Sequence, residues 1–260
     1  SMCSLAMLDL LGVVGDRVGG QIPTCLGSLS LLSVLSLQGD SLSGTLPPGL
    51  GCLTRLTMLS LGGGPAVHGM FPTFVASLKR IDSLYISRMS GITGPIPSLL
   101  AELPLLIDCR LNGNGFTGGL PSAMGSMHLI ELDLSANKMS GPIPLVLGSL
   151  SHMQYLYLND NFLTGTLPEF LGSMDLWVLS LQQNLLIGTL PEYAGNHIGY
   201  LMLSTNSFSG TIPESYTNAY ATLSLSDNLL TGTVSSAIGL SGVQSVGLND
   251  NMLTSTIPLS

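Results

Sequence analysis

The chain has 260 residues, a formal net charge of −8 and only 8% charged residues, while 45% of its residues are hydrophobic. An ordinary soluble domain carries about 25% charged residues, so Ser, Thr, Asn and Gly must supply most of the polar surface. Seven Lys and Arg residues give no basic footprint for nucleic acid, and Ser or Gly interrupts every leucine cluster before it could span a membrane. Composition therefore argues against a nucleic-acid partner and against a membrane span within this chain.

Pairs of apolar residues separated by one polar residue recur along the chain, and each pair predicts a short β-strand with one buried face. The first six pairs are Leu8/Leu10, Leu35/Leu37, Leu59/Leu61, Leu84/Ile86, Cys109/Leu111 and Leu132/Leu134. The last five pairs are Leu156/Leu158, Leu179/Leu181, Leu201/Leu203, Leu223/Leu225 and Val246/Leu248. An apolar-Pro dipeptide ends ten residues after most pairs, and these prolines from Pro23 to Pro213 lie 22 to 25 residues apart. One such coil cannot bury its own apolar face, so the pattern predicts eleven stacked coils.

One Asn recurs at the same position after the strands of the later repeats, and we call these residues the Asn column. Its members are Asn114, Asn137, Asn161, Asn184, Asn206, Asn228 and Asn251. Because Asn both donates and accepts hydrogen bonds, we expect these side chains to pair backbone groups inside each bend. Asp40, Gly64 and Met89 occupy the column in the early repeats. The segment Leu10–Pro23 is three residues longer than usual, and Leu61–Pro72 and Ile86–Pro97 are one residue longer, which predicts irregular bends there.

The repeated pattern LxxLxLxxNxLxGxIPxxLGxL resembles the plant-type subclass of leucine-rich repeats over essentially residues 3–260. The resemblance implies an α/β fold: a right-handed leucine-rich repeat solenoid of about eleven coils with a parallel sheet on its concave face. Members such as receptor-like ectodomains, polygalacturonase-inhibiting proteins and parasite surface antigens imply non-catalytic protein or peptide recognition, outside the cell or at its surface. Since the chain starts and stops inside a repeat, we expect residues 1–260 to be one domain and a fragment of a longer chain.

The outward strand positions of the fourth to ninth repeats are the candidate partner-binding residues. They are Tyr85, Asp108, Arg110, Glu131, Asp133, Tyr155, Tyr157, Tyr200 and Met202. Stacked parallel strands bring such columns into contact, and aromatic and Arg side chains are enriched in binding hot spots. We therefore expect the concave sheet to bind a protein or peptide; the oligomeric state stays open.

A second array suggests an alternative, ice binding. Hydroxyl side chains flank the Gly or Ser of the later coils at Thr164/Thr166, Ile187/Thr189, Ser209/Thr211, Thr231/Thr233 and Thr254/Thr256, where Ile187 is the one departure. Residues i and i+2 share a face, so this ladder is regular and resembles the ice-binding faces of other solenoids. The competing explanation is the ordinary preference of β-branched residues for strands.

Signals for catalysis and cofactors are weak. Gly113, Gly115 and Gly118 have dinucleotide-motif spacing, with Glu131 and Asp133 following, but the repeat itself explains these glycines. His68, His128, His152 and His197 do not converge with carboxylates or thiols, so we expect solvated surface histidines. We therefore predict no enzyme activity, no cofactor and no metal site.

Four cysteines lie far apart in the sequence, without the CxxC spacing of a zinc site. Cys109 replaces a core leucine, and we expect a buried, inert thiol. Cys25 and Cys52 fall in adjacent coils, and the sequence leaves open whether they form a disulfide.

Overall fold

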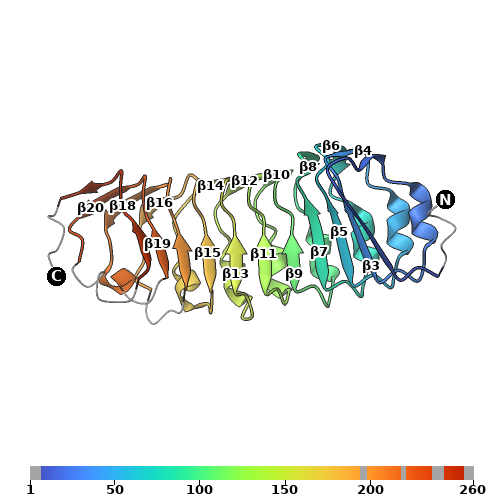
Figure 1. The fold of residues 1–260 in the computed structure, drawn as a ribbon. Helices are drawn as coiled ribbons and strands as arrows, with labels where there is room; N and C mark the ends of the chain where they lie inside the picture. Colours follow the sequence, from blue (N-terminus) through green and yellow to red (C-terminus); the bar gives the residue numbers. More distant parts are fainter. Residues whose placement is uncertain (1–6, 194–197, 218–220, 236–242, 255–260) are drawn as a thin grey trace. The chain divides into compact units, whose positions relative to one another are not determined.

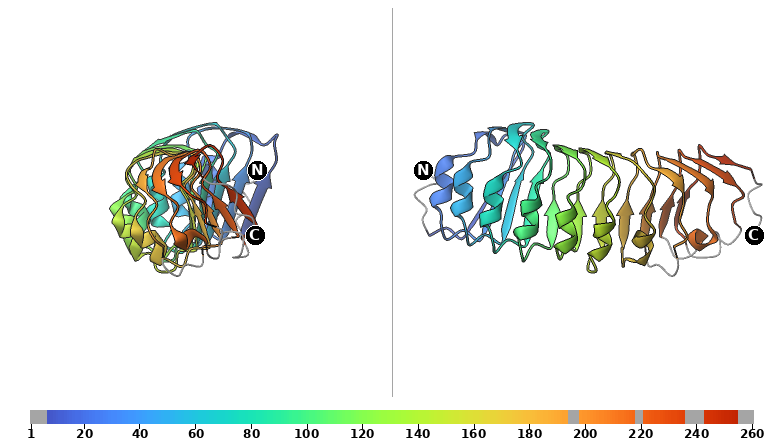
Figure 2. Two further views of the ribbon diagram at one scale, coloured as in Figure 1. Left: turned by 90° about the vertical axis from the view of Figure 1, so that its left-hand side faces the viewer. Right: turned by 180° about the vertical axis from the view of Figure 1, so that it is seen from behind.

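The computed structural model describes residues 7–193, 198–217, 221–235 and 243–254, which form two compact units. Unit 1 comprises residues 1–138 and unit 2 residues 139–260. In each unit the chain winds through successive coils, with a strand of the main sheet on one side and short 3₁₀ helices or loops on the other (Figures 1 and 2).

The main sheet of unit 1 is parallel, with strand order β1-β3-β5-β7-β9-β11. Its strands are β1 (Leu10–Val14), β3 (Val34–Gln38), β5 (Met58–Gly62), β7 (Ser83–Ser87), β9 (Asp108–Arg110) and β11 (Glu131–Asp133). Leu35, Leu59 and Leu84 align in register and are fully buried, because alternate residues of each strand point into the core. We use "outward face" for the opposite, solvent-facing side of a main sheet.

A second parallel sheet follows the bend of each coil in unit 1. It contains β2 (Gly19–Gln21), β4 (Ser41–Gly44), β6 (Ala66–Met70), β8 (Gly91–Gly94) and β10 (Gly115–Gly118). The coils close through 3₁₀ helices η2 (Thr24–Ser28), η3 (Pro48–Cys52), η4 (Thr73–Ser77), η5 (Ser98–Glu102) and η6 (Ser122–Ser126). Each of these helices begins directly after the proline of an apolar-Pro dipeptide and buries one apolar residue, such as Leu26 or Val75. The proline fixes φ where the chain leaves the strand and enters the helix.

Unit 2 repeats this architecture. Its main sheet contains β13 (Tyr155–Tyr157), β15 (Val178–Ser180), β17 (Tyr200–Met202), β19 (Thr222–Ser224) and β21 (Ser245–Gly247). After the bends, β12 (Lys138–Gly141), which begins at the unit boundary, pairs with β14 (Phe162–Leu163). The second sheet of unit 2 is a separate four-stranded sheet of β16 (Ile187–Thr189), β18 (Ser207–Thr211), β20 (Leu229–Gly232) and β22 (Met252–Leu253). The 3₁₀ helices are η7 (Leu145–Ser149), η8 (Glu169–Ser173) and η9 (Glu214–Thr217). The main sheets of the described residues thus hold six and five strands, as the eleven repeats predict.

The Asn column forms the predicted hydrogen-bond ladder. In unit 2, Asn184 Nδ2 donates to the carbonyls of Leu158 and Leu181 at 3.0 Å each, and its Oδ1 accepts from the backbone N–H of Leu163 at 3.0 Å. In unit 1, Asn137 bonds the carbonyls of Leu111 and Leu134. Each Asn therefore satisfies buried backbone groups of its own coil and of the preceding coil, which ties the stack together.

The prediction for the first coil is wrong by three residues. In the structure Leu11 pairs with Leu35 and Val13 pairs with Leu37, so these residues, and not Leu8 and Leu10, are the first apolar pair. Val13 lies ten residues before Pro23, which is the usual spacing, and the expected three-residue insertion does not exist. Leu10 is instead exposed. Alternation alone could not distinguish two overlapping apolar pairs at the end of the array.

The extra residues of the third and fourth coils are confirmed. The buried apolar residue that follows the Asn column is two positions after Asn114 but three positions after Gly64 and Met89. These coils close the gap with turns in which the N–H groups of Val67 and Ile92 donate to the carbonyls of Gly64 and Met89.

Cys52 is an exposed free thiol, so the disulfide between Cys25 and Cys52 that the sequence left open is not formed; Cys25 is disulfide-bonded. Cys109 is fully buried as predicted, and burial raises the pKa of its thiol far above the ordinary value. Within the described ranges, no helix has both the length and the apolar character needed to cross a membrane.

Candidate functional site

The predicted site residues of unit 1 come together on the outward face of β7, β9 and β11. The parallel register places Tyr85 beside Arg110, and Arg110 beside Asp133. Asp108 lies beside Glu131 in the neighbouring column. All five side chains are half-buried, because the residues between them on each strand point into the leucine core.

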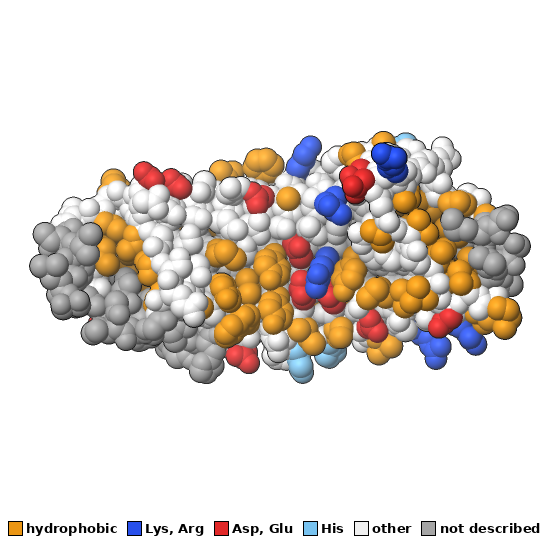
Figure 3. Space-filling model, viewed as in Figure 1, with side chains coloured by type: hydrophobic (Ala, Val, Ile, Leu, Met, Phe, Trp, Pro, Cys, Tyr) orange, Lys and Arg blue, Asp and Glu red, His pale blue; other side chains and the backbone are white. Residues whose placement is uncertain are grey.

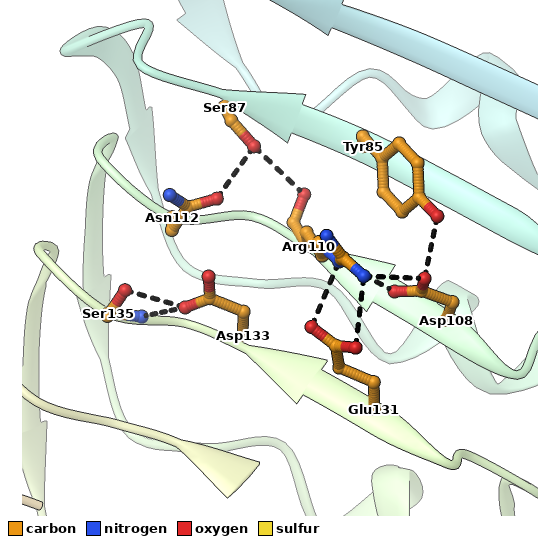
Figure 4. Close-up of polar contacts among 8 residues, drawn as sticks. All are labelled: Tyr85, Ser87, Asp108, Arg110, Asn112, Glu131, Asp133 and Ser135. Carbon is orange, nitrogen blue, oxygen red and sulfur yellow. Dashed lines mark hydrogen bonds and ion pairs between the residues drawn. The ribbon is translucent and has the colours of Figure 1, made fainter. Parts of the chain in front are cut away.

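Arg110 is the centre of this ion-pair cluster (Figure 4). Its Nε and Nη2 atoms donate to the two carboxylate oxygens of Asp108 at 3.1 Å each, and Nη2 also donates to Glu131 Oε2 at 3.0 Å. Nε forms an ion pair with Glu131 Oε1 at 2.9 Å. Its guanidinium carbon lies 5.0 Å from the ring centroid of Tyr85, whose hydroxyl donates to Asp108 at 2.6 Å. The fork geometry of guanidinium suits such paired carboxylates, so Arg110 orders both acids and the tyrosine.

The electrostatics follow from this arrangement. Burial and the hydrogen bond to Asp108 raise the pKa of Tyr85 to about 12. Burial and the charge of Asp108 raise the pKa of Glu131, which Arg110 partly offsets. Burial opposes the charge of Arg110, but the hydrogen bond and charge of Asp108 outweigh burial and raise the pKa of the guanidinium. Most of the N–H groups of Arg110 thus donate within the protein and are not available to a ligand.

A hollow of about 250 Å³ adjoins this cluster at the ends of the strands. Besides Tyr85, Arg110 and Asp133, it is lined by polar residues that the sequence reasoning did not include among the site residues: Gln38, Ser60, Ser87, Arg88 and Asn112. Asn112 Oδ1 accepts a hydrogen bond from Ser87 at 2.8 Å. Arg88 has a left-handed φ of 57° at the bend that follows β7. Ser60 lies between the residues of an apolar pair, Gln38, Ser87 and Asn112 directly follow such pairs, and Arg88 comes one residue later. These regular positions are the signal that could have found them.

The predicted site residues of unit 2 form a different, uncharged surface. Tyr155, Val178 and Tyr200 share one column of β13, β15 and β17, and Tyr157, Ser180 and Met202 share the next. Val178 and Ser180 are buried although they point outward, because larger side chains flank them on both sides in the register. Hydrophobic side chains gather over β13 and β15, whereas the acidic and basic side chains gather over β9 and β11 (Figure 3).

Trp177 is the residue of this surface that the sequence reasoning missed. It directly precedes β15 and packs edge-to-face against Tyr200, with ring centroids 6.0 Å apart. It is 49% exposed and, with Gln154, Tyr155 and Asp175, lines a hollow of about 230 Å³. The predicted outward columns begin one residue later, although the only Trp of the chain is itself a sufficient signal.

The alternative surface, the hydroxyl ladder, lies on the second sheet of unit 2. Thr189 pairs with Ser209, and Thr211 pairs with Thr231. The γ-methyl groups of Thr166, Thr189 and Thr211 lie close to Gly188, Gly210 and Gly232 of the next coil, where a Cβ would approach them to about 3 Å. Thr164, Thr166, Thr189, Thr211 and Thr233 are exposed, and Thr256 lies outside the described residues.

The remaining motifs have structural explanations. Gly113 has a φ of 69° at the bend before β10, and Gly115 and Gly118 belong to that strand, so no helix opens after them. His68, His128 and His152 are exposed as predicted; His197 lies outside the described residues.

Two family models match the chain. The leucine-rich repeat domain of EGF-like domain-containing protein ComC matches residues 151–230, and the leucine-rich repeat matches residues 128–150. No curated protein sequence matches.

Solved structures are similar over nearly the whole chain. The ectodomain of the Arabidopsis receptor kinase HAESA, in complex with an extended IDA peptide hormone, is 34% identical with a TM-score of 0.88 over 96% of this chain and 44% of its own. The TDR receptor is 29% identical with a TM-score of 0.81 over 99% of this chain and 50% of its own. A plant ice-binding protein is 29% identical with a TM-score of 0.79 over 86% of this chain and 74% of its own.

The chain thus spans half or less of the length of these two receptor structures. The leucine-rich repeat is indicated by the repeat pattern, by the stacked parallel strands with their Asn column, and by both comparisons. This chain is a plant-type leucine-rich repeat protein, similar to the ectodomains of plant receptor kinases.

Proposed function

We propose that the protein is a non-catalytic recognition module that binds a protein or peptide through the outward faces of its main sheets. The observation that carries the proposal is the group of partly exposed aromatic side chains, Tyr155 on β13, Trp177 directly before β15 and Tyr200 on β17, beside a hollow in unit 2. Partly exposed Trp and Tyr are the side chains that most often dominate binding energy in protein interfaces.

Similarity to known receptors supports this proposal. The HAESA ectodomain structure contains a peptide hormone, and its match covers both units. Because that structure is an ectodomain, it supports the proposal that this protein acts outside the cell or at its surface. Extended sheet faces are the surfaces that solenoid proteins generally use for binding.

A displayed library of random peptides, selected on the whole protein, tests the proposal. We expect enriched peptides to lose binding to the double variant Tyr155→Ser/Tyr200→Ser, since it removes two aromatic anchors from the outward face. Leu145→Ser is the matched control, because Leu145 is a 77% exposed apolar residue on η7, away from the main sheet. Equal losses in both variants, or no enrichment at all, would contradict the proposal.

Ice binding is the second candidate, favoured by the exposed hydroxyls of Thr189 on β16 and of Ser207 and Thr211 on β18, and by the similarity to a plant ice-binding protein. The register pairs Thr189 with Ser209 and Thr211 with Thr231, so these side chains are repeated at the strand spacing of about 4.8 Å. The hydroxyl ladder lies on the second sheet and leaves the outward face of the main sheet free, so the two candidates can be tested separately.

Thermal hysteresis of the purified protein tests ice binding. We expect Thr189→Tyr to abolish it, because the larger ring breaks the flat array, while Thr222→Tyr on the main sheet leaves it intact. A wild-type protein without hysteresis or ice-shaping activity ends this candidate.

A further inference from the structure

Charge is distributed very unequally between the two units. All seven Lys and Arg residues of the chain lie in residues 1–138, together with eight of its fifteen Asp and Glu residues, which gives a formal net charge of −1. Residues 139–260 contain the other seven acidic residues and no Lys or Arg, which gives −7. The net charge of unit 2 therefore favours cationic partners, and unit 2 has no Lys or Arg to pair with an acidic one.

The hollow beside β13 and β15 holds an aromatic platform in a fixed position. A Cβ at Gly199 would lie 3.0 Å from indole carbons of Trp177, so the indole lies against this glycine and leaves no room for a side chain there. The Trp177 backbone N–H donates to the backbone carbonyl of Gln154 at 2.8 Å, and the Trp177 carbonyl accepts from the backbone N–H of Gly199 at 2.9 Å. Neighbouring coils thus hold the ring, while about half of the residue stays accessible.

Asp175 is the acidic residue of this hollow, and the repeat does not explain it. Six acidic residues of unit 2 occupy recurring positions: Asp160, Asp227 and Asp250 at left-handed bends, and Glu169, Glu192 and Glu214 directly after prolines. Asp175 has no such counterpart, since three residues before the paired Tyr155, Val178 and Tyr200 the adjacent coils carry His152 and His197. Among the described residues, its carboxylate and the side-chain amide of Gln154 make no hydrogen bond or ion pair, and both residues are exposed.

We infer that this hollow binds a basic peptide segment, with an Arg or Lys side chain lying over the Trp177 indole and paired with Asp175. An aromatic face attracts a cation through its quadrupole, with Trp the strongest such ring, and the adjacent carboxylate supplies the counter-charge. Gln154 and Tyr155 line the same hollow, and both side chains carry an oxygen that can accept N–H donors. This inference rests on the proposed recognition function and specifies the chemistry of the partner.

Trp177 itself reports binding, because it is the only Trp of the chain. The whole protein is titrated with a short acetylated and amidated peptide of alternating Gly and Arg, at physiological ionic strength. The control peptide carries citrulline, the neutral isostere, in place of Arg. We expect a saturable change of tryptophan fluorescence with the Arg peptide and a binding constant at least about fivefold weaker with the citrulline peptide.

Two charge-matched variants separate a local contact from general attraction. Asp175→Asn removes the carboxylate from the hollow, and we expect about fivefold weaker binding of the Arg peptide. Glu169→Gln removes one negative charge from η8 outside the hollow, and we expect less than about a twofold change, because salt screens charges separated by more than about 8 Å. Trp177→Leu, measured by anisotropy of a dye-labelled peptide, should weaken binding as much as Asp175→Asn.

The outcomes distinguish this inference from the proposed function. Equal binding of the Arg and citrulline peptides, equal effects of Asp175→Asn and Glu169→Gln, or a stronger response to a neutral oligosaccharide would each overturn the cationic assignment. Either of the first two results would still be compatible with the proposed peptide recognition. If the protein binds neither these peptides nor any library peptide, the inference and the proposed function fail together.

Discussion

The two units use the same coil to build outward faces of opposite character. In unit 1 the outward columns of β7 to β11 are joined by an ion-pair cluster around Arg110. In unit 2 the equivalent columns of β13 to β17 are joined by packing, with Val178 buried between Tyr155 and Tyr200 in the register. The backbone ladder and the Asn column are alike in both, so the fold tolerates either kind of surface and the outward positions are free to serve binding.

The largest predicted effect tests whether the hydrogen bonds of the Asn column stabilise both units alike. Asn137→Ala and Asn184→Ala each leave one buried N–H and two buried carbonyls without their side-chain partner. Since an unsatisfied buried group costs about 1–3 kcal/mol, each variant should lower the free energy of unfolding by about 3–5 kcal/mol in urea titrations. A loss below about 1 kcal/mol in either unit would show that the Asn ladder does not hold that unit together.

Val178→Ala tests the packed column of unit 2. The change removes two methyl groups from a buried site, which should cost about 2 kcal/mol of unfolding free energy. Because the lost contact is apolar, the cost should not change between low and high salt. A salt-dependent loss would mean that charges elsewhere in unit 2 set the stability of this face.

Arg110→Ala tests the charged column of unit 1. Removing the guanidinium leaves Asp108 and Glu131 close together without their counter-ion, but Arg110 is 43% exposed and solvent screens the repulsion. We expect a loss of about 1 kcal/mol at low salt that shrinks as salt is added, in contrast to Val178→Ala. Arg110→Met retains much of the stem and serves as the control for packing over Tyr85.

Much of the fold was predictable from the sequence, because the burial of one apolar face recurs in every coil. Leu35, Leu59 and Leu84 lie in register as their spacing indicates, and the Asn column forms the expected bonds. The exception is the first coil, where Leu8/Leu10 and Leu11/Val13 both fit the alternation. Only pairing with β3 selects the second pair, and such pairing is a tertiary contact that no local pattern contains.

The candidate surfaces were predictable in position but not in chemistry. Alternation placed Arg110 on the outward face, but it could not show that both Asp108 and Glu131 engage the guanidinium. Trp177 was missed because it lies just before its strand, and Gly199, against which its indole packs, belongs to the next coil. These features depend on side-chain geometry between coils, which the repeat period does not specify.

The smallest predicted effect is spectroscopic and concerns Tyr85. Its pKa of about 12 in the folded protein exceeds the ordinary value of 10.0, owing to burial and then to the hydrogen bond and charge of Asp108. Because the folded-state pKa is raised, the contribution of Tyr85 to stability is complete below pH 10 and is lost as the pH rises from about 10 to about 12. Asp108→Ala removes both the hydrogen-bond acceptor and the charge but leaves most of the burial, so the pKa should fall part of the way toward 10.0, measured by tyrosinate absorbance with Tyr85→Phe identifying the signal. An unchanged pKa in Asp108→Ala would show that burial alone protects the phenol, and the ion-pair cluster would then not extend to Tyr85.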